Sequence, residues 1–408
     1  MIVLSGAELV LPDRILSPGT LVIDGGRIVD IRPGAVQTGP GFAFHGHYIL
    51  PGFVDVHVHG VEGVDSLQAG DAISSIAARL TRYGVTAFCP TTVACSPETL
   101  RRVLEQVRRS REAPAPGAAR VLPAHLESNF INPKYKGAQP AICLRSPRAA
   151  LDARARHDAP VTEHGAEGAP FEAARILVEI ERAAPDVGIV TLAPELDGGL
   201  DLVAWLLARG HRVSLGHSAA TYDEALSAIA AGARHATHLF NRMPPLGHRS
   251  PGLAGAILES EDVAAELICD GFHVHPALVR TAIAAKRPSR VLAITDGTAA
   301  SGLAVGSTAL LGDETISVGE TAAFLRDGTL AGSVLTMDGA FRMLVERAGV
   351  SLVDAATMCA TTPARELGLV GHGVLAVDGI ADVAILDRRL SVVQTYVGGQ
   401  LAYSRSQV

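Results

Sequence analysis

The sequence predicts an α/β protein: a (β/α)8 TIM-like barrel that carries a small β-sandwich domain built from both termini. Three observations lead to this prediction. Short apolar runs alternate with longer stretches of helical periodicity through the middle of the chain, as in repeated βα units around a parallel sheet. Both ends contain only short β-type runs separated by turn signals. Histidines and carboxylates recur where the apolar runs end, which is where barrel enzymes build their active sites.

The two ends of the chain have the same β character. The first fifty residues contain runs over Ile2–Leu4, Leu9–Leu11, Thr20–Ile23 and Arg27–Ile31, and the C-terminus has runs over Ala381–Leu386, Val392–Val397 and Leu401–Tyr403. Asp24-Gly25-Gly26 marks a hairpin turn, because glycine accepts the positive φ that such turns need. Neither end has enough apolar surface for a core of its own, so we expect 1–50 and 370–408 to form one discontinuous domain. The barrel would then occupy 51–369.

Eight strands are predicted between the ends. They cover Phe53–Val56, Val85–Cys89, Arg120–Ala124, Gly188–Leu192, Arg212–Leu215, His235–Thr237, Val263–Ile268 and Val291–Ile294. Helical periodicity fills the gaps, for example over Ala72–Tyr83, Pro97–Arg109, Phe171–Ala184, Tyr222–Ala231 and Pro276–Ala285. Ser96-Pro97 and Asp71 stand where helices begin, as capping and first-turn residues do. Two long segments are expected to form part of a binding site. One is a long polar loop over 128–168, and the other is a β-hairpin insertion over 302–330.

The first predicted barrel strand runs directly into two histidines, His57 and His59. Because side chains alternate along a strand, both point to the same side and can bind one metal ion. Taken alone, the pair is equally consistent with hydrogen-bonded core histidines. The interpretation as a metal site is favoured because metal-compatible or acid–base residues also follow the third, fifth, sixth and eighth strands; these are Glu127, His217, His238 and Asp296.

A second His-x-His pair, His45 and His47, precedes Pro51 and lies outside the predicted barrel. We therefore interpret these two histidines as surface or turn residues. The basic residues are almost all arginine, and the only lysines are Lys134, Lys136 and Lys286.

Composition narrows the classes of function. The chain has 408 residues, of which 48% are hydrophobic, so it can bury a large core. The net charge of -7 comes without a basic block, and we expect no nucleic-acid partner. No apolar run is long enough to span a bilayer and the N-terminus lacks a signal-peptide pattern, so we predict a cytoplasmic protein without membrane contact. The five cysteines are scattered and lack zinc-ribbon spacing, which favours reduced thiols.

A set of motifs carries a resemblance to a known family. These motifs are Pro-Gly-Phe-Val-Asp-Val-His-Val-His-Gly (51–60), His-Leu-Glu (125–127), Leu-Gly-His-Ser (215–218), Thr-His-Leu-Phe-Asn-Arg-Met-Pro (237–244), Pro-Gly-Leu-Ala-Gly (251–255), Asp-Gly-Phe-His-Val (270–274), Thr-Asp-Gly (295–297) and Leu-Ala-Gly-Ser (330–333). Together they resemble the amidohydrolase superfamily, and within it the N-acetylglucosamine-6-phosphate deacetylases, over nearly the whole chain. The resemblance implies hydrolysis of the acetamide of an N-acetylhexosamine 6-phosphate to the hexosamine 6-phosphate and acetate.

The resemblance also implies a metal centre. In this family the glutamate and the two later histidines hold one tight metal, which makes Glu127, His217 and His238 the expected ligands of a divalent ion. Zn²⁺ is the first choice, with Fe²⁺ or another divalent ion as alternatives. Related enzymes bridge two metals with a carbamylated lysine on the fourth strand; no lysine is present in that strand here, so Glu127 would bridge instead. His57 and His59 would hold the second metal.

Amide hydrolysis also needs a carboxylate that takes the proton of the attacking water and returns it to the departing amine. Asp296, at the end of the eighth strand, is the candidate for this catalytic role. An alternative role for Asp296 is that of an additional metal ligand or a helix cap.

The resemblance further implies a set of substrate-binding residues: Ala138, Gln139, Asn241, Arg242, Arg249, His273, Leu330, Ala331 and Gly332. Arginine suits phosphate because its planar fork pairs two oxygens at once. Arg249 is implied to reach the phosphate in a neighbouring subunit, which makes the expected protein a homodimer with sites completed in trans. The alternative is that Arg242 and Arg249 are solvated surface charges.

The identity of the sugar stays open at this point. The family usually has Glu-Gly-Pro after the metal strand and a histidine twelve residues beyond that glutamate. Here the chain reads Glu127-Ser128-Asn129, and the twelfth residue on is Gln139. N-acetylgalactosamine 6-phosphate is therefore an alternative substrate. A second alternative is a related enzyme that acts on N-acyl amino acids, but such an enzyme would not need Arg249. A third is a metal-binding barrel without catalytic activity, which the full set of metal ligands disfavours.

Overall fold

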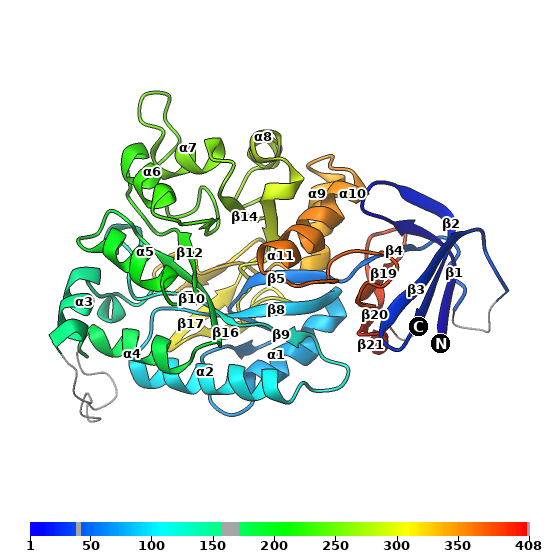
Figure 1. The fold of residues 1–408 in the computed structure, drawn as a ribbon, viewed down its shortest axis with the longest axis horizontal. Coiled ribbons are helices and arrows are strands. Elements are labelled where there is room, and N and C mark those ends of the chain that lie inside the picture. The colour runs from blue at the N-terminus through cyan, green and yellow to red at the C-terminus, as the bar shows by residue number, and fades with distance from the viewer. Residues whose placement is uncertain (38–41, 157–170, 406–408) are drawn as a thin grey trace.

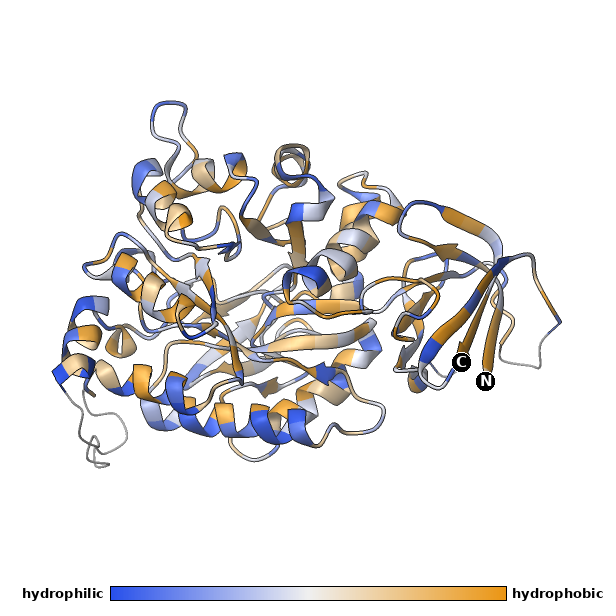
Figure 2. Ribbon diagram, viewed as in Figure 1, coloured by the Kyte–Doolittle hydropathy of each residue, from blue (hydrophilic) through white to orange (hydrophobic). Residues whose placement is uncertain are grey.

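The structure is a computed structural model and describes residues 1–37, 42–156 and 171–405. It consists of a barrel surrounded by helices and a separate β-sheet that contains both chain ends (Figure 1). Figure 2 shows the apolar residues gathered along the strands of both parts and on the helix faces that cover the barrel. No helix among the described residues is both long and apolar enough to cross a membrane.

The barrel contains eight parallel strands in sequence order. They are β5 (Phe53–Val58), β8 (Val85–Thr92), β10 (Ala124–Glu127), β11 (Val187–Leu192), β12 (Arg212–Leu215), β13 (His235–Ala236), β14 (Ala264–Ile268) and β15 (Val291–Ile294). The first and last strands meet where the backbone N–H of Asp296 donates to the carbonyl of His57 at 3.0 Å. The predicted eight-stranded barrel is confirmed.

The third predicted strand, Arg120–Ala124, is wrong in its bounds. The segment divides into β9 (Arg120–Val121), which pairs with β8, and β10 (Ala124–Glu127), which pairs with β8 and β11. Pro123 stands between the two pieces, and proline cannot donate a hydrogen bond to a strand ladder. The strand therefore resumes after the proline and reaches Glu127 itself.

The helices of the structure follow the predicted periodicity. They are α1 (Ala72–Leu80) with η1 (Thr81–Tyr83), α2 (Pro97–Glu112), α3 (Pro147–Arg156), α4 (Ala174–Arg182), α5 (Gly199–Leu207), α6 (Tyr222–Ala230), α7 (Gly252–Glu259), α8 (Pro276–Lys286), α9 (Met337–Glu346), α10 (Leu352–Ala356) and α11 (Thr362–Glu366). Ser96 caps α2 by accepting from the N–H of Thr99. Asp71 stands at the predicted position directly before α1, but its side chain makes no cap hydrogen bond.

The terminal segments form one seven-stranded sheet in the order β21-β20-β19-β4-β1-β2-β3. These strands are β1 (Ile2–Val10), β2 (Ile15–Asp24), β3 (Arg27–Pro33), β4 (Tyr48–Pro51), β19 (Val383–Leu386), β20 (Val392–Val397) and β21 (Gln400–Ser404). The sheet folds back on itself, because the N–H of Ile28 donates to Gly379 and that of Ala381 to Gly26. The fold is consistent with the expected β-sandwich, although β1 is continuous where two runs were predicted. The domain limits at 50/51 and 369/370 stay predictions.

The two long segments both lie beside the barrel. The insertion after β15 is a three-stranded meander of β16 (Thr308–Leu311), β17 (Glu314–Val318) and β18 (Ala323–Leu325), so the predicted two-stranded hairpin is wrong by one strand. The chain turns back a second time after β17, where the N–H of Gly319 donates to the carbonyl of Ala322. The long polar loop contains η2 (Pro133–Tyr135), η3 (Ala141–Cys143) and α3, and its remainder over 157–168 lies outside the described residues.

Candidate metal centre

Three side chains from three strands converge at the C-terminal end of the barrel. Glu127 ends β10, His217 follows β12 and His238 follows β13. Oε1 of Glu127 lies 2.7 Å from Nε2 of His217 and 2.9 Å from Nε2 of His238, and the two imidazole nitrogens are 3.0 Å apart. All three side chains are buried. The residues named from the sequence as the ligands of the tightest metal are thus in mutual contact.

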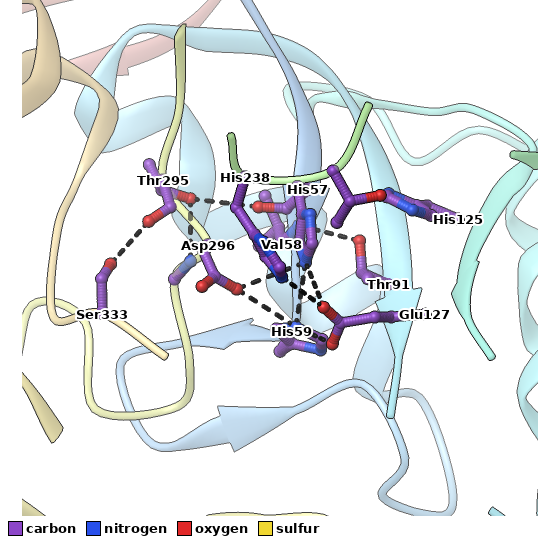
Figure 3. Close-up of polar contacts among 12 residues, drawn as sticks. His57, Val58, His59, Thr91, His125, Glu127, His238, Thr295, Asp296 and Ser333 are labelled. Atoms are coloured by element: carbon purple, nitrogen blue, oxygen red, sulfur yellow. Dashed lines mark hydrogen bonds and ion pairs between the residues drawn. The ribbon is translucent and has the colours of Figure 1, made fainter. Parts of the chain in front are cut away.

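The first His-x-His pair completes the same cluster. Nε2 of His57 lies 3.2 Å from Nε2 of His59, and Oδ1 of Asp296 lies 3.3 Å from both nitrogens. Oε2 of Glu127 is 3.5 Å from Nε2 of His59, so this carboxylate faces both groups of histidines. Figure 3 shows His57 and His59 from one strand pointing toward Glu127 and Asp296 from two others.

A bulge brings His57 into the barrel. Val56 packs in the apolar cluster formed by alternate residues of the barrel strands, whereas Val58 packs in the core that contains the helices. Strict alternation would put His57 on the opposite side of the strand from Val56, but the pairing of β5 with β8 shifts register between Asp55 and Val58. Because of the bulge, Val56 and His57 can both face the inside of the barrel. The apolar residues around Val56 then lie directly beneath the histidines.

The donor set fits a divalent cation. Imidazole nitrogens and a carboxylate oxygen are the ligands that zinc and similar ions take in proteins. Two groups each contain two imidazole nitrogens and a carboxylate oxygen that lie within 4.8 Å of one another, close enough to contact one ion. Glu127, His217 and His238 form one of them, and His57, His59 and Glu127 form a second.

The electrostatics of the cluster also favour a cation. Burial would raise the pKa of Glu127, but the neighbouring His217 outweighs it and holds the pKa well below its usual value. The pKa of Asp296 is lowered against its burial by His57 and His59. Burial would lower the pKa of His57, but the charges of Glu266 and Asp296 raise it to about 10. Ionised carboxylates thus dominate the field at this end of the barrel.

Three of these residues have a strained backbone. The φ angles are +49° at His217, +29° at His238 and +48° at Asp296. Non-glycine residues seldom adopt positive φ, at a cost on the order of 1–3 kcal/mol each, and such residues concentrate at functional sites. The turn at His217 is held by Glu195, which accepts from Oγ of Ser218 at 2.7 Å and from the N–H of Ala219 at 2.6 Å.

A cavity with about 490 Å³ of empty space, open to solvent, lies over the cluster. Most of the predicted site residues line it: Ala138, Gln139, Asn241, Arg242, His273, Leu330 and Gly332, together with His59, Glu127, His217, His238 and Asp296. Val93, Ile268 and Leu311 also line it and were not foreseen. Nothing in their local sequence distinguishes them from core residues.

Three polar groups of this cavity have defined partners. The Gln139 side chain is held at both ends, because its Oε1 accepts from the N–H of Ala94 at 2.7 Å and its Nε2 donates to Oε2 of Glu127. Nδ1 of His273 lies 2.6 Å from a carboxylate oxygen of Asp270. Arg242 donates to the carbonyl of Leu330 at 3.4 Å and makes no ion pair within the described parts of the chain.

Two of the predicted substrate-binding residues do not line the cavity. Ala331 is fully buried, and only its neighbours reach the cavity. Arg249 is exposed and does not line the cavity of its own chain. His45 lies in an exposed turn and His47 is half-buried beside it, as expected for residues outside the site.

Sequence analysis missed Glu266, whose carboxylate contacts His57. It is a single charge inside the apolar run from Val263 to Ile268. A lone carboxylate in a buried strand must be paired, and that rule was the signal that could have found it.

Comparison with known proteins identifies the family. The model of the Amidohydrolase family matches residues 48–402. The chain is 35% identical to the N-acetylglucosamine-6-phosphate deacetylase of Mus musculus over 418 residues, covering 97% of this chain and 95% of the relative. It is also 35% identical to an N-acetylgalactosamine-6-phosphate deacetylase of Escherichia coli O157:H7, covering 87% of each chain.

Solved structures agree with the sequence relatives. A mutant of N-acetyl-D-glucosamine-6-phosphate deacetylase from Mycobacterium smegmatis, in complex with N-acetyl-D-glucosamine-6-phosphate, superposes with a TM-score of 0.85 at 31% identity over 99% of both chains. The likeness extends over the barrel and the terminal sheet alike. With its candidate metal-binding residues gathered at the end of this barrel, the chain belongs to the amidohydrolase family and, within it, to the N-acetylglucosamine-6-phosphate deacetylases.

Proposed function

We propose that this protein hydrolyses the acetamide of N-acetylglucosamine 6-phosphate to glucosamine 6-phosphate and acetate, with the help of a divalent metal. The observation that carries the proposal is the convergence of Glu127, His217 and His238 beneath a cavity whose wall contains Arg242, a cation without a carboxylate partner among the described residues. The names of the relatives support the reaction. The E. coli relative keeps N-acetylgalactosamine 6-phosphate as a second candidate substrate.

Glu127, His217 and His238 would hold the tight ion, and His57 and His59 a second one. Zn²⁺ is our first choice, because two imidazoles and a carboxylate with a position left open are typical of catalytic zinc sites. When bound, such an ion supplies Lewis-acid chemistry, polarising the acetyl carbonyl and lowering the pKa of water. Gln139 orients Glu127 by donating to its second carboxylate oxygen.

Asp296 would move the proton. Its carboxylate lines the cavity, and its lowered pKa keeps it ionised at neutral pH despite burial. An ionised carboxylate can take a proton from the attacking water at Oδ and deliver it to the departing amine nitrogen. The N–H of Asp296 donates to His57 and its carbonyl accepts from Ser333 at 2.9 Å, so both sides of the strained residue are fixed.

Arg242 and Asn241 would meet the sugar phosphate from the same chain, and Arg249 from a second copy. Arg249 is exposed, lies outside its own cavity, and sits in a loop rich in proline and glycine after His238. These features suit a side chain that completes a site across a two-fold interface. We therefore propose a homodimer, and we keep the cytoplasmic location as a prediction.

The test is an acetate-release assay with the purified, metal-loaded protein. The panel contains N-acetylglucosamine 6-phosphate, N-acetylgalactosamine 6-phosphate, the two unphosphorylated sugars and several N-acetyl amino acids. We expect turnover of a 6-phosphate and its near loss in Asp296→Asn, which keeps the size of the side chain but cannot hold the proton. Faster turnover of the amino acids than of either sugar phosphate would refute the proposal.

A further inference from the structure

We propose that Glu266 is a positioning residue of this site: it holds His57 in the orientation and tautomer that leave Nε2 free for a metal ion. Oε2 of Glu266 lies 2.9 Å from Nδ1 of His57, and both side chains are fully buried. The inference rests on the proposed function, because it assumes that His57 is a metal ligand.

One carboxylate holds parts of two strands. Glu266 lies in the middle of β14, and its Oε2 accepts from the backbone N–H of His238 at 3.2 Å as well as from His57. Its Oε1 lies 2.8 Å from Nε2 of His235, which belongs to β13 shortly before His238. Glu266 thus ties β5 and β13 together directly beneath the metal centre, without lining the cavity itself.

The tautomer follows from the chemistry of the partners. Metal binding needs the neutral form of His57, and because an ionised carboxylate can only accept, the single proton of that form belongs on Nδ1 and the lone pair on Nε2. Asp296 competes for the same ring from the other side, since its Oδ1 lies 3.3 Å from Nε2. Without Glu266, a proton on Nδ1 would be a buried donor without a partner, and the ring would instead carry its proton on Nε2 toward Asp296. That proton would block the metal-binding nitrogen.

The other ligands show that this support is specific to His57. His217 has a backbone partner, since its Nδ1 lies 2.7 Å from the carbonyl of Tyr135. Nδ1 of His59 and Nδ1 of His238 have no hydrogen-bond partner in the described structure. His57 is thus the candidate ligand whose ring is oriented by a buried carboxylate, an arrangement known to raise metal affinity.

The experiment measures the affinity for each of two ions by chelator competition with Co²⁺ and Zn²⁺. Glu266→Met keeps the approximate size of the side chain and removes the acceptor. We expect the ion at His57 and His59 to bind about 10- to 100-fold more weakly in this variant. The ion at Glu127, His217 and His238 should keep its affinity. Glu266→Gln can still offer a carbonyl oxygen to Nδ1, so it should lose less.

A spectroscopic readout separates positioning from packing. In protein saturated with Co²⁺, the Nδ1–H proton of a metal-bound His57 should give a shifted proton resonance that exchanges slowly with solvent in wild type and Glu266→Gln, and faster in Glu266→Met, where the proton has no acceptor. The matched control is His235→Leu, which removes the partner of Oε1 of the same carboxylate and leaves the His57 contact of Oε2 intact. It should keep the second ion. If Glu266→Met does not fold, Glu266→Asp serves instead. Its side chain is one methylene shorter, which moves the carboxylate away from Nδ1 of His57 and should likewise weaken binding of the second ion.

Three results would overturn the inference. The first is an unchanged affinity for the second ion in Glu266→Met or Glu266→Asp. The second is an equal loss of both ions in Glu266→Met and His235→Leu, which would mean a structural role alone. The third is a wild-type protein that binds one ion only. None of them contradicts the deacetylase proposal, which depends on acetate release and on the ion at Glu127, His217 and His238.

Discussion

Replacing Arg242 with methionine should weaken the preference for a phosphorylated sugar. The guanidinium lines the cavity, contacts the carbonyl of Leu330 at 3.4 Å and has no carboxylate partner among the described residues, so a substrate anion has no competitor there. A hydrogen bond to a charged group contributes about 1.5–3 kcal/mol, and Arg242 is half-buried, so we expect a loss of about 2 kcal/mol. At 1.4 kcal/mol per factor of ten, this is a fall of about 30-fold in kcat/KM.

The assay compares kcat/KM for N-acetylglucosamine with and without its 6-phosphate, in wild type, Arg242→Met and Arg242→Lys. The phosphate contact exists before and during the reaction, so the loss should fall on KM and leave kcat nearly unchanged. Lysine keeps the charge without the fork and should recover part of the loss. Arg234→Met, which removes an exposed arginine outside the cavity, is the control. An equal loss for both sugars would refute the reasoning, as would no loss for either.

The remaining expectations concern metal, assembly and stability. His217→Ala should lose the tightest ion and the activity, because one of its three ligands is removed. Metal analysis of the purified variant tests this. Full metal content with retained turnover would contradict the assignment of the metal site. Arg249→Ala and Asp296→Asn proteins should each be nearly inactive, yet random re-association should recover about a quarter of wild-type sites if Arg249 acts in trans; no recovery after confirmed subunit exchange would exclude that role. Asp382 is buried and bound by Arg120 Nη1 at 2.6 Å and 2.7 Å, and its pKa is lowered by His372 and Arg120 against its burial. The pKa of Asp382 in the folded protein lies below its unfolded value of about 3.9. Its contribution to the free energy of unfolding is therefore present above that pH and is lost as the pH falls through the folded pKa. Asp382→Asn should therefore lower the free energy of unfolding by about 3 kcal/mol at pH 7, and the difference from wild type in urea titrations should shrink below pH 4; a constant difference across this range would contradict it.

Much of the site could be predicted because its parts stand at the ends of apolar runs. In a parallel barrel the carboxyl ends of all strands meet at one rim, so residues that follow eight runs become neighbours whatever the connecting loops do. His57, His217, His238 and Asp296 were found in this way. Arg249 could be assigned only through the resemblance, because its proposed role depends on a second copy of the chain.

Local periodicity and motif spacing by themselves determined the eight-stranded barrel, the terminal sheet, the metal-binding residue types and the family. These properties depend on residues close together in the chain, where alternation and helical repeat act directly. The third strand was misplaced because Pro123 interrupts a run that is otherwise apolar.

Only the tertiary structure decided how the imidazole rings of the histidines are oriented. The bulge at His57 and the positive φ angles at His217, His238 and Asp296 are imposed by neighbouring strands and not by local preference. The partner of His57 is Glu266, 209 residues away in the chain. Which nitrogen of a histidine is free depends on what faces the other nitrogen, and that is set by strand packing at long range. A sequence determines which donors are available, whereas the closed barrel determines where their lone pairs point.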